Sequence, residues 1–468
     1  MTEMKRYAIK KAFSYFHTST SRFPINVVFA DGSNYQNVPG KVEITVRFNT
    51  SDAEWNTFVF NYIGFVEEYR LGNITIDGPD GNVEALRKLL RMSFEMHKSP
   101  AQKTFNPVAW VLKQWQEYRL NNRSYLQEKR NLYAHYNMPS EFFHYMNGEL
   151  YGYTEGYYET GAESQNEAQF KKYEYICRKL RLKPGDKVVE VGSAWGTMAL
   201  MMAKRYGADV VNYGLVDEQN RVMQERVLKM GLQEKIKIEQ RDCRELGHEK
   251  ERYDKYASLG VLEHAGKDCV EDWIRNISEA LKPGGIGVIT NVGTMTTYYT
   301  DFIYAKYIWR GCYFPRMQEI FDHFSKYDLH VVDLEDSHFL YAQTMEVMLA
   351  KMLEHWEKIR AINPDIFDEK FKRIWTLYYL GAIEGFRSKH SALHTYQYTF
   401  VKGRAEIYPK TREFLYDKPF DTSDMHEYEV PLGQDGFPEF RDKTTRPDIE
   451  TGFPFEAVNA QEAAPITY

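Results

Sequence analysis

Residues 186–198 read DKVVEVGSAWGTM. A short apolar run at 188–191 leads into a glycine turn at 192–196, and a helical pattern of apolar residues follows directly. This order predicts a strand, a tight turn and a helix. Glycine at both ends of the turn permits close approaches that a side chain would block, so main-chain N–H groups can meet a ligand at the end of the strand. Glu190, just before the turn, can reach the same ligand.

The glycine spacing excludes two common nucleotide-binding loops. It is neither the G-x-G-x-x-G of a dinucleotide site nor the G-x-x-x-x-G-K-[ST] of a phosphate-binding loop. An acid followed by G-x-x-x-G is similar to the first motif of the S-adenosylmethionine-dependent methyltransferases, in which the loop holds the amino acid part of the cofactor. The alternative is an ordinary strand-to-helix turn of another α/β fold.

Regular alternation of strands and helices continues on the carboxyl side of this turn. Strands are predicted at 210–215, 236–242, 253–259 and 286–291, with helices at 217–230 and 270–281 and a further candidate strand at 396–401. This alternation predicts an α/β fold with a doubly wound, mostly parallel sheet. Ligands bind at the carboxyl ends of such strands. Glu190, Asp242 and Glu263 all fall near strand ends, which predicts one shared site.

Four regions are expected along the chain. Residues 1–110 form a small, lipid-associated α+β domain, with strands near 41–48 and 72–78, a helix near 83–90 and a turn at Asn34. Residues 111–135 form a charged helical linker. The main domain, 136–402, carries an aromatic insertion near 295–330, a long helix from about 344 and another at 371–387. Residues 403–468 form a polar tail without periodicity, extended or partly disordered.

Composition narrows the class of protein. The 468 residues carry a net charge of −6, from 60 basic and 66 acidic side chains, and no basic run indicates nucleic acid binding. Neither a membrane-spanning stretch nor a signal peptide is evident. Four scattered cysteines show no metal-binding or disulfide spacing, so no metal site is predicted and a reducing, cytoplasmic location is expected. The 35 Tyr and 28 Phe can line a lipid channel, face a cation or fill a large core.

Several motifs together resemble the cyclopropane-fatty-acid synthase family, which includes the mycolic acid methyltransferases. The resemblance spans roughly residues 40–402, and it rests on HYN at 135–137, YTEGYY at 153–158, EAQ at 167–169, EVGSAWG at 190–196, the helix start at Gln219, GVLEHAG at 260–266, LKPGG at 281–285, Tyr341 and GFR at 385–387. It implies a seven-stranded, Rossmann-like methyltransferase sheet, S-adenosylmethionine as cofactor and a lipid acyl chain as methyl acceptor. The residues that it places against the cofactor are Tyr136, Tyr153, Thr154, Glu190, Gly192, Ser193, Ala194, Gly196, Gln219, Asp242, Cys243 and Leu259.

The resemblance also implies an active centre, from which this chain departs. In the family a cysteine, the glutamate of G-x-x-E-H, a histidine and a tyrosine bind a bicarbonate. Glu263 and Tyr341 match the glutamate and the tyrosine, but Glu155 stands at the cysteine position and Thr290 at that of the histidine. The catalytic candidates are therefore Glu155, Glu263, His264, Thr290, Asn291 and Tyr341.

The two departures argue against a bound bicarbonate. An anion beside both Glu155 and Glu263 would suffer like-charge repulsion in a dry site. Our hypothesis is that the Glu155 carboxylate replaces bicarbonate as the proton acceptor. The alternatives are structural: Glu155 could form a salt bridge in a loop, Glu263 and His264 could cap a helix, and Tyr341 could belong to the core.

The expected reaction is methyl transfer to the double bond of an unsaturated phospholipid acyl chain. The product would be a cyclopropane, methylene, methyl-branched or methylated unsaturated chain. The enzyme would approach the membrane peripherally, and a homodimer and a partner reductase stay open. The rival interpretations are a small-molecule amine N-methyltransferase and a non-catalytic lipid-binding protein with the same fold.

Overall fold

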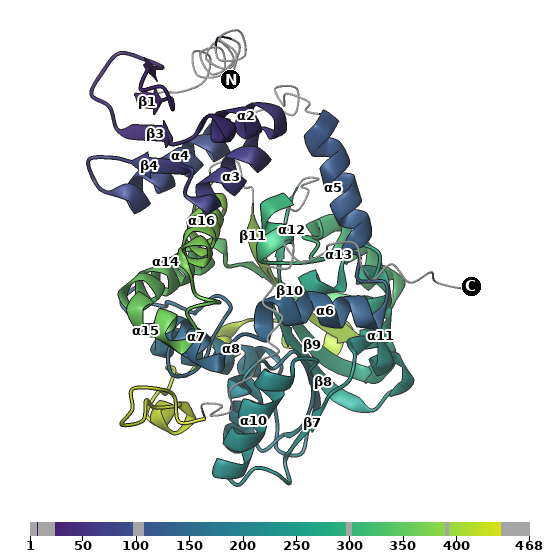
Figure 1. The fold of residues 1–468 in the computed structure, drawn as a ribbon. Coiled ribbons are helices and arrows are strands. Elements are labelled where there is room, and N and C mark those ends of the chain that lie inside the picture. Colours follow the sequence, from purple (N-terminus) through teal and green to yellow (C-terminus); the bar gives the residue numbers. More distant parts are fainter. Residues whose placement is uncertain (1–6, 8–23, 97–106, 296–301, 389–392, 441–468) are drawn as a thin grey trace, which may run out of the picture.

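The computed structural model describes Tyr7 and residues 24–96, 107–295, 302–388 and 393–440 (Figure 1). Its centre is a seven-stranded sheet of order β10-β11-β9-β8-β5-β6-β7. The strands are β5 (Lys187–Val191), β6 (Asp209–Tyr213), β7 (Ile236–Glu239), β8 (Tyr253–Leu259), β9 (Leu281–Gly293), β10 (Leu329–Asp336) and β11 (His394–Lys402). β11 is antiparallel to both of its neighbours, whereas β5 to β9 pair in parallel.

Helices cover both faces of this sheet because its inner strands are apolar on both sides. Val188 packs with α8 (Gln165–Lys179), α9 (Thr197–Tyr206) and α10 (Asp217–Lys229). Val189 points to the opposite face, toward α11 (Val270–Ala280) and α13 (Met317–Lys326). Successive side chains of a strand alternate between faces, so a buried parallel strand needs a helical layer on each. The doubly wound, mostly parallel seven-stranded sheet expected from the sequence is confirmed.

A smaller α+β unit precedes the large sheet, which confirms the second part of the expected fold class. Its four strands, in the order β2-β1-β3-β4, are β1 (Ile25–Val28), β2 (Asn34–Gln36), β3 (Ile44–Phe48) and β4 (Ile74–Asp77), and its helices are α2 (Ser51–Phe60), α3 (Tyr62–Leu71) and α4 (Asn82–Met96). The prediction of a turn at Asn34 is wrong, because Asn34 begins β2 opposite Val28. A three-residue edge strand is too short to show alternation.

Ion pairs join the small unit to α16 (Glu369–Phe386), the last long helix. Nε of Arg87 lies 2.6 Å from Oε1 of Glu384, and Nε of Arg91 lies 2.8 Å from Oε2. The Glu384 side chain is 3% exposed, so each carboxylate oxygen needs such a partner. The small unit therefore sits against α16, as Figure 1 shows.

The helical connection expected at 111–135 is two helices, α5 (Pro107–Arg119) and α6 (Tyr125–Tyr136), followed by α7 (Ser140–Asn147). Ser124 caps α6 by accepting a hydrogen bond from the Gln127 N–H. In the break, Nδ2 of Asn122 donates to the carbonyl oxygen of His264 at 2.6 Å. This contact fixes the break beside the short turn η3 (Leu262–Ala265), against which α6 packs.

The part after β9 differs most from the predicted elements. It contains α12 (Phe302–Tyr307), α14 (His338–Glu354) and α15 (Trp356–Ile362) besides α13 and α16. The long helix begins at 338 rather than at about 344, and the Asp336 carboxylate, just before the helix, accepts a hydrogen bond from the His338 N–H. β10 was not predicted, since charged residues interrupt the apolar pattern of this edge strand.

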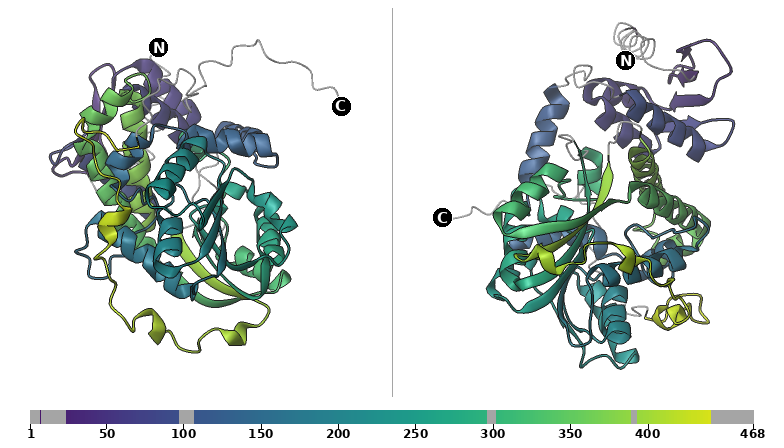
Figure 2. Two further views of the ribbon diagram at one scale, coloured as in Figure 1. Left: turned by 90° about the horizontal axis from the view of Figure 1, so that it is seen from below. Right: turned by 180° about the vertical axis from the view of Figure 1, so that it is seen from behind.

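The polar tail follows an extended path along the main body (Figure 2), with three short turns, η4 (Ala405–Ile407), η5 (Glu413–Leu415) and η6 (Met425–Tyr428), of which η5 contacts α8 and η6 contacts α9. Arg178 on α8 donates to the carbonyl oxygens of Leu415, Lys418 and Pro419. Buried Arg226 on α10 donates to the Tyr428 carbonyl at 2.6 Å. Up to residue 440 the tail is therefore held by side chains of the main body; residues 441–468 lie outside the described residues.

Candidate active site

The turn at 192–196 lies at the carboxyl end of β5, and its backbone requires glycine at two positions. Gly192 has a φ of +78°, and a Cβ there would lie 2.6 Å from Cγ2 of Val261. Gly196 has a φ of +90°, and its Cβ would lie 2.5 Å from Cγ of Met223. Residues with a side chain rarely adopt such φ values. The turn therefore keeps bare backbone at the strand end, where a ligand can approach it closely.

Glu190 and the middle of the turn lie together at this strand end. The Ser193 N–H donates to Oδ1 of Asn212, and Ala194 adopts a φ of 50°. The Glu190 side chain is buried, and its Oε2 has no hydrogen-bond partner among the described residues. Burial raises the pKa of Glu190 to about 7. An unpartnered buried carboxylate oxygen fits the ammonium group of a ligand such as S-adenosylmethionine, which would also favour the ionised carboxylate.

The segment around Thr154 closes over the end of β8, next to the glycine turn. Gly260, which follows Leu259, has a φ of +63°, and a Cβ there would lie 2.5 Å from Cγ2 of Thr154. The Gly260 N–H donates to the carbonyl oxygen of Thr290 at 2.9 Å and to its Oγ1 at 3.0 Å. Thr154, Leu259 and Thr290 are therefore brought together from three separate parts of the sequence.

Asp242 and Cys243 follow β7, which ends at 239 rather than at the predicted 242 because Asp242 caps the short helix η2 (Cys243–His248). Arg244 pairs with the Asp242 carboxylate and with Glu128 on α6. Burial and the neighbouring Asp242 raise the pKa of Glu128 to about 8, although Arg244 opposes this shift. Cys243 is buried here, and Gln219 lies half-buried in the first turn of α10.

Two buried carboxyl groups, Glu155 and Glu263, form the chemical centre of the site. Their side chains are 3% and 5% exposed. Oε1 of Glu263 accepts the Val292 N–H, whereas Oε2 of Glu263 and both oxygens of Glu155 lack a hydrogen-bond partner in the part of the chain that the structure describes. Burial, together with the charge of Glu155, raises the pKa of Glu263 to about 8. The two carboxyls therefore act on each other, and holding one proton between them avoids a buried double charge.

Lys172 on α8 supplies a buried positive charge beside this pair. Its Nζ donates to Oγ1 of Thr154 at 2.8 Å and to Oε1 of Gln169, whose amide in turn donates to the Thr154 carbonyl at 2.7 Å. Burial lowers the pKa of Lys172 to about 8, although the neighbouring Glu155 opposes this shift. Burial raises the pKa of Glu155, and Lys172 opposes that shift. Lys172 therefore favours the carboxylate form of Glu155.

Tyr341 approaches the same two acids from the first turn of α14. Its ring stacks on Phe386 with 5.0 Å between ring centres. Burial, with further contributions from Tyr378, Glu155 and Glu263, raises the pKa of Tyr341, so the phenol is neutral. On the same helix, Oγ1 of Thr344 accepts the Gly156 N–H at 2.8 Å. α14 thus positions Tyr341 and holds the backbone next to Glu155.

Aromatic rings enclose this centre. His135 is stacked between Trp309 and Trp375, at 4.4 and 5.3 Å between ring centres, and its Nε2 lies 2.9 Å from the Tyr153 hydroxyl. Burial is the main cause that lowers the pKa of His135 to about 3. The imidazole is therefore neutral at ordinary pH, and it adds a flat ring rather than a charge to the wall.

A second neutral histidine lies on the η3 side of the enclosure. Nε2 of His264 lies 3.0 Å from the Tyr136 hydroxyl, and its Nδ1 lies 3.1 Å from Sγ of Cys312. Burial lowers the pKa of His264 to about 4. The two histidines thus contribute hydrogen-bonded but uncharged rings near the acids.

Thr290 and Asn291 do not face the same side of the sheet. Thr290 follows the alternation of Val288, on the α8 side, whereas Asn291 follows Ile289, on the α11 side. The Asn291 amide donates to the carbonyl oxygen of Val292. β9 therefore presents Thr290 to the region of Thr154, while the Val292 N–H donates a hydrogen bond to Glu263.

Sequence reasoning missed several residues that the structure places here: Lys172, Val292, Trp309, Thr344 and Trp375. Lys172 follows the EAQ segment by one helical turn, so helical spacing from Gln169 could have indicated it. The rings of Trp309 and Trp375 lay in stretches already noted as aromatic or helical. The backbone N–H of Val292 carries no signal in the sequence.

The raised carboxyl pKa values predict a stability that falls as pH rises. Glu263 has a pKa of about 8 when folded and 4.5 otherwise, so over this range the folded chain retains a proton that the unfolded chain has lost. The free energy of unfolding then decreases with pH, by at most about 5 kcal/mol for this group. We measure the free energy of unfolding in urea as a function of pH between the two pKa values of Glu263. We expect Glu263→Gln to reduce the slope of this free energy against pH, and Glu234→Gln, at an exposed site, to leave the slope unchanged. An unchanged slope in Glu263→Gln would contradict the assignment.

Comparison with known proteins places the chain in a family. The model of the mycolic acid cyclopropane synthetase family matches residues 123–396. A probable fatty acid methyltransferase of Pseudomonas putida is 30% identical over 60% of this chain and 72% of its own length. The cyclopropane-fatty-acyl-phospholipid synthase of Escherichia coli K12 is 30% identical over 59% of this chain and 70% of its own length. The solved structure of coclaurine N-methyltransferase is 17% identical, has a TM-score of 0.58, and covers 72% of this chain and 99% of that one.

The last similarity shows the fold alone, because its identity is low. The first three confirm the family resemblance, and the range that the family model matches contains the motifs at 135–137, 153–158, 190–196 and 260–266. The matched range contains the glycine turn, both buried carboxyls and Tyr341. The chain therefore belongs to the mycolic acid cyclopropane synthetase family of S-adenosylmethionine-dependent methyltransferases.

Proposed function

We propose that the protein transfers the methyl group of S-adenosylmethionine to a carbon–carbon double bond in the acyl chain of an unsaturated phospholipid. The observation that carries this proposal is the pair of buried carboxyls, Glu155 and Glu263, inside an aromatic enclosure next to the glycine turn. An alkene that accepts a methyl cation becomes a carbocation, which a negative, dry, ring-lined site stabilises.

The cofactor would be held at the carboxyl ends of β5 to β8. The bare backbone of 192–196 and the unpartnered oxygen of Glu190 fit its amino acid part, while Tyr153 and Thr154 close over it. Gln219, Asp242 and Cys243 lie on the side of β6 and β7 and would take the rest of the molecule. When bound, the cofactor supplies an electrophilic methyl group on a positively charged sulfur.

The aromatic wall keeps water away from the reacting chain. Trp309, Trp375 and Tyr153 pack around the neutral His135, and rings of this kind also face positive charge favourably. Because both histidines are neutral, neither ring sets a positive charge against the carbocation. Exclusion of water matters, since water would trap the carbocation as an alcohol.

Glu155 is the proposed base that completes the reaction. The carboxylate takes a proton either from the transferred methyl group, whose C–H electron pair then bonds to the cationic carbon and closes the ring, or from a chain carbon next to the cationic centre, whose C–H electron pair forms a double bond. Lys172 supports the ionised form before the reaction, and the positive charge of the bound cofactor acts in the same direction. Glu263, which holds its proton at neutral pH, then does not compete for this role.

The same electrostatics disfavour the bicarbonate of the resembled family. A bound bicarbonate would lie beside Glu155, which occupies the position of one of its ligands and carries the same charge. Glu155 also offers two oxygens without a hydrogen-bond partner among residues that the structure covers, which supports its role as the proposed base. We therefore propose a reaction without bicarbonate.

Contact with a membrane surface is part of this proposal, since the substrate chain belongs to a lipid. Helix α5 exposes an apolar and aromatic stripe on one face, from Val108 and Val111 to Trp115 and Tyr118, with 41, 56, 47 and 83% exposure. Trp and Tyr are enriched at membrane interfaces. None of the described helices is both long and apolar enough to cross a bilayer. We propose peripheral contact through this stripe.

Isotope labelling tests the function directly. Cells that make monounsaturated lipids and express the protein are grown with methionine that carries a trideuterated methyl group, and their fatty acids are analysed by mass spectrometry. We expect label in the fatty acids. Two retained deuterons mean that the proton left the transferred methyl, which gives a cyclopropane or a methylene group; three mean that it left the chain, which gives a methylated alkene.

Absence of label from all lipids would contradict the proposal. A panel of amines, tested with the purified protein, would then ask whether the acidic pair serves an N-methyltransferase. Calorimetry with S-adenosylmethionine separates both from a non-catalytic protein, because a chain that binds no cofactor cannot transfer its methyl group.

A further inference from the structure

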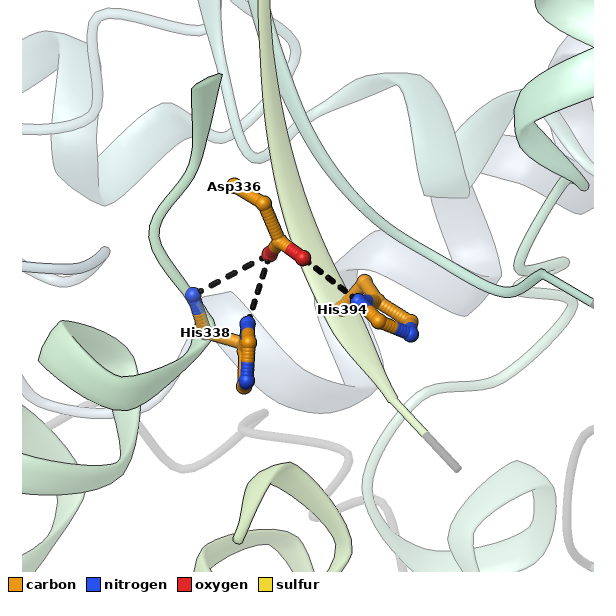
Figure 3. Close-up of side chains that lie close together, drawn as sticks. All are labelled: Asp336, His338 and His394. Atoms are coloured by element: carbon orange, nitrogen blue, oxygen red, sulfur yellow. Dashed lines mark hydrogen bonds and ion pairs between the residues drawn. The ribbon is translucent and has the colours of Figure 1, made fainter. Parts of the chain in front are cut away.

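Three side chains with metal-binding chemistry meet where β10 ends, α14 begins and β11 begins, as Figure 3 shows. Oδ1 of Asp336 lies 2.8 Å from Nδ1 of His338, and Oδ2 of Asp336 lies 2.6 Å from Nδ1 of His394. One ligand atom from each residue lies within 4.8 Å of the other two. Both imidazoles thus turn the same nitrogen toward one carboxylate, although the three residues come from separate elements.

We propose that Asp336, His338 and His394 bind a divalent transition-metal ion, of which Zn²⁺ is the best match. Zn²⁺ prefers imidazole nitrogens and carboxylate oxygens in a tetrahedral arrangement, at about 2.0–2.2 Å from each. Atoms at those distances are spaced about 3.3 Å apart, so small side-chain rotations from the observed hydrogen bonds suffice. The ion would replace the two N–H protons that now point at the carboxylate.

The burial of the three residues suits an ion with one open position. His394 is 8% exposed, His338 20% and Asp336 31%. The ring of His394 is fixed by stacking on Tyr396, with 5.2 Å between ring centres and 6° between ring planes. A cation would therefore be held by protein on one side and would take water as its fourth ligand on the other.

The site lies near the active centre but outside it. His338 stands one helical turn before Tyr341 on α14, and Thr344, which binds the backbone next to Glu155, follows on the same helix. A bound ion would fasten the start of this helix to the ends of two strands. We infer a structural role, in which the ion stiffens the element that positions Tyr341. This inference does not depend on the identity of the methyl acceptor.

The test measures metal binding by the full chain after treatment with a chelator. Titration calorimetry with ZnCl₂ should show one ion bound by Asp336, His338 and His394 and a higher melting temperature when it is present. His338→Asn and His394→Asn should each weaken Zn²⁺ binding at least about tenfold. His330→Asn is the matched control, because His330 lies on β10 and pairs with Asp328 in an exposed position.

Spectroscopy on the unaltered protein keeps the test independent of how the variants fold. Copper(II) bound at this site should show electron paramagnetic couplings to imidazole nitrogen. Cobalt(II) should show no thiolate charge-transfer band, whereas the other cluster with ligand spacing, Glu128, Asp242 and Cys243, would produce one. No binding of Zn²⁺, equal binding by both histidine variants and the control, or a thiolate band alone would overturn the proposal and leave a hydrogen-bonded His–Asp–His group.

Discussion

Replacing Glu155 with glutamine is expected to abolish methylated product while S-adenosylmethionine still binds. The amide keeps the size of the side chain but cannot accept the proton that must leave after methyl transfer. Loss of a positioned base typically costs a hundredfold or more, so we expect a fall of at least about 10² in turnover. Cofactor affinity should stay within about twofold, because Lys172 bonds to Thr154 and Gln169 rather than to Glu155, so the substitution leaves these contacts in place.

The measurement is labelled product per unit of enzyme, with cofactor affinity from calorimetry on the same preparation. Glu159→Gln is the control, since Glu159 lies four residues further along the same segment and its side chain is 46% exposed. Near-normal turnover in Glu155→Gln would remove Glu155 as the base. A Glu155→Cys, Thr290→His double variant with unchanged rate and product would likewise show that the reaction does not depend on this carboxylate.

Alanine at Gly192 is expected to weaken binding of S-adenosylmethionine by at least about tenfold, or roughly 1.4 kcal/mol. Two effects strain the turn in the variant. A residue with a side chain pays about 1–2 kcal/mol for the positive φ, and the new Cβ would lie 2.6 Å from Val261, which must move at the end of β8. The turn can relieve this clash only by shifting the backbone that the cofactor would contact.

Gly185→Ala separates the clash from the φ cost. Gly185 precedes β5 and has a φ of +83°, and a Cβ at this position would have no heavy atom within 4 Å. The substitution therefore costs only the free energy of the unfavourable backbone conformation. We expect both variants to lose stability in urea, but only Gly192→Ala to lose cofactor affinity in calorimetry. Equal affinities in the two variants would mean that the glycine turn is not where the cofactor binds.

Local spacing was enough to predict much of the fold. The predicted strands are short apolar runs between turn residues, at 188–191, 210–215 and 253–259. A parallel strand that is buried on both faces requires such a run. β10 was not predicted because its charged residues interrupt the apolar pattern. These acids are explained by a residue distant in the sequence, since Lys179 on α8 pairs with Asp333 and Glu335. Such a strand can be understood only once its partner helix is in place.

The residues of the active site also differ in whether the sequence alone could indicate them. Glu190 and Glu263 could be placed from the sequence, because acids at the ends of parallel strands converge at one edge. Glu155 became a candidate through the family resemblance, since no local pattern distinguishes it from a loop acid. Lys172 was missed because a buried lysine looks like a surface lysine until its surroundings are known. Thr290 and Asn291 are both catalytic candidates in the sequence, although adjacent residues of one strand face opposite sides of the sheet.

The ion pairs of Arg87 and Arg91 with Glu384 connect the small N-terminal unit mechanically to α16. An α-helix is a stiff rod, and Trp375 stands about 13 Å along it from Glu384. The small N-terminal unit holds this helix near its carboxyl end, and Trp375, further along the same helix, forms part of the aromatic wall around His135. We therefore expect a displacement of the small unit to be transmitted along α16 and to move Trp375.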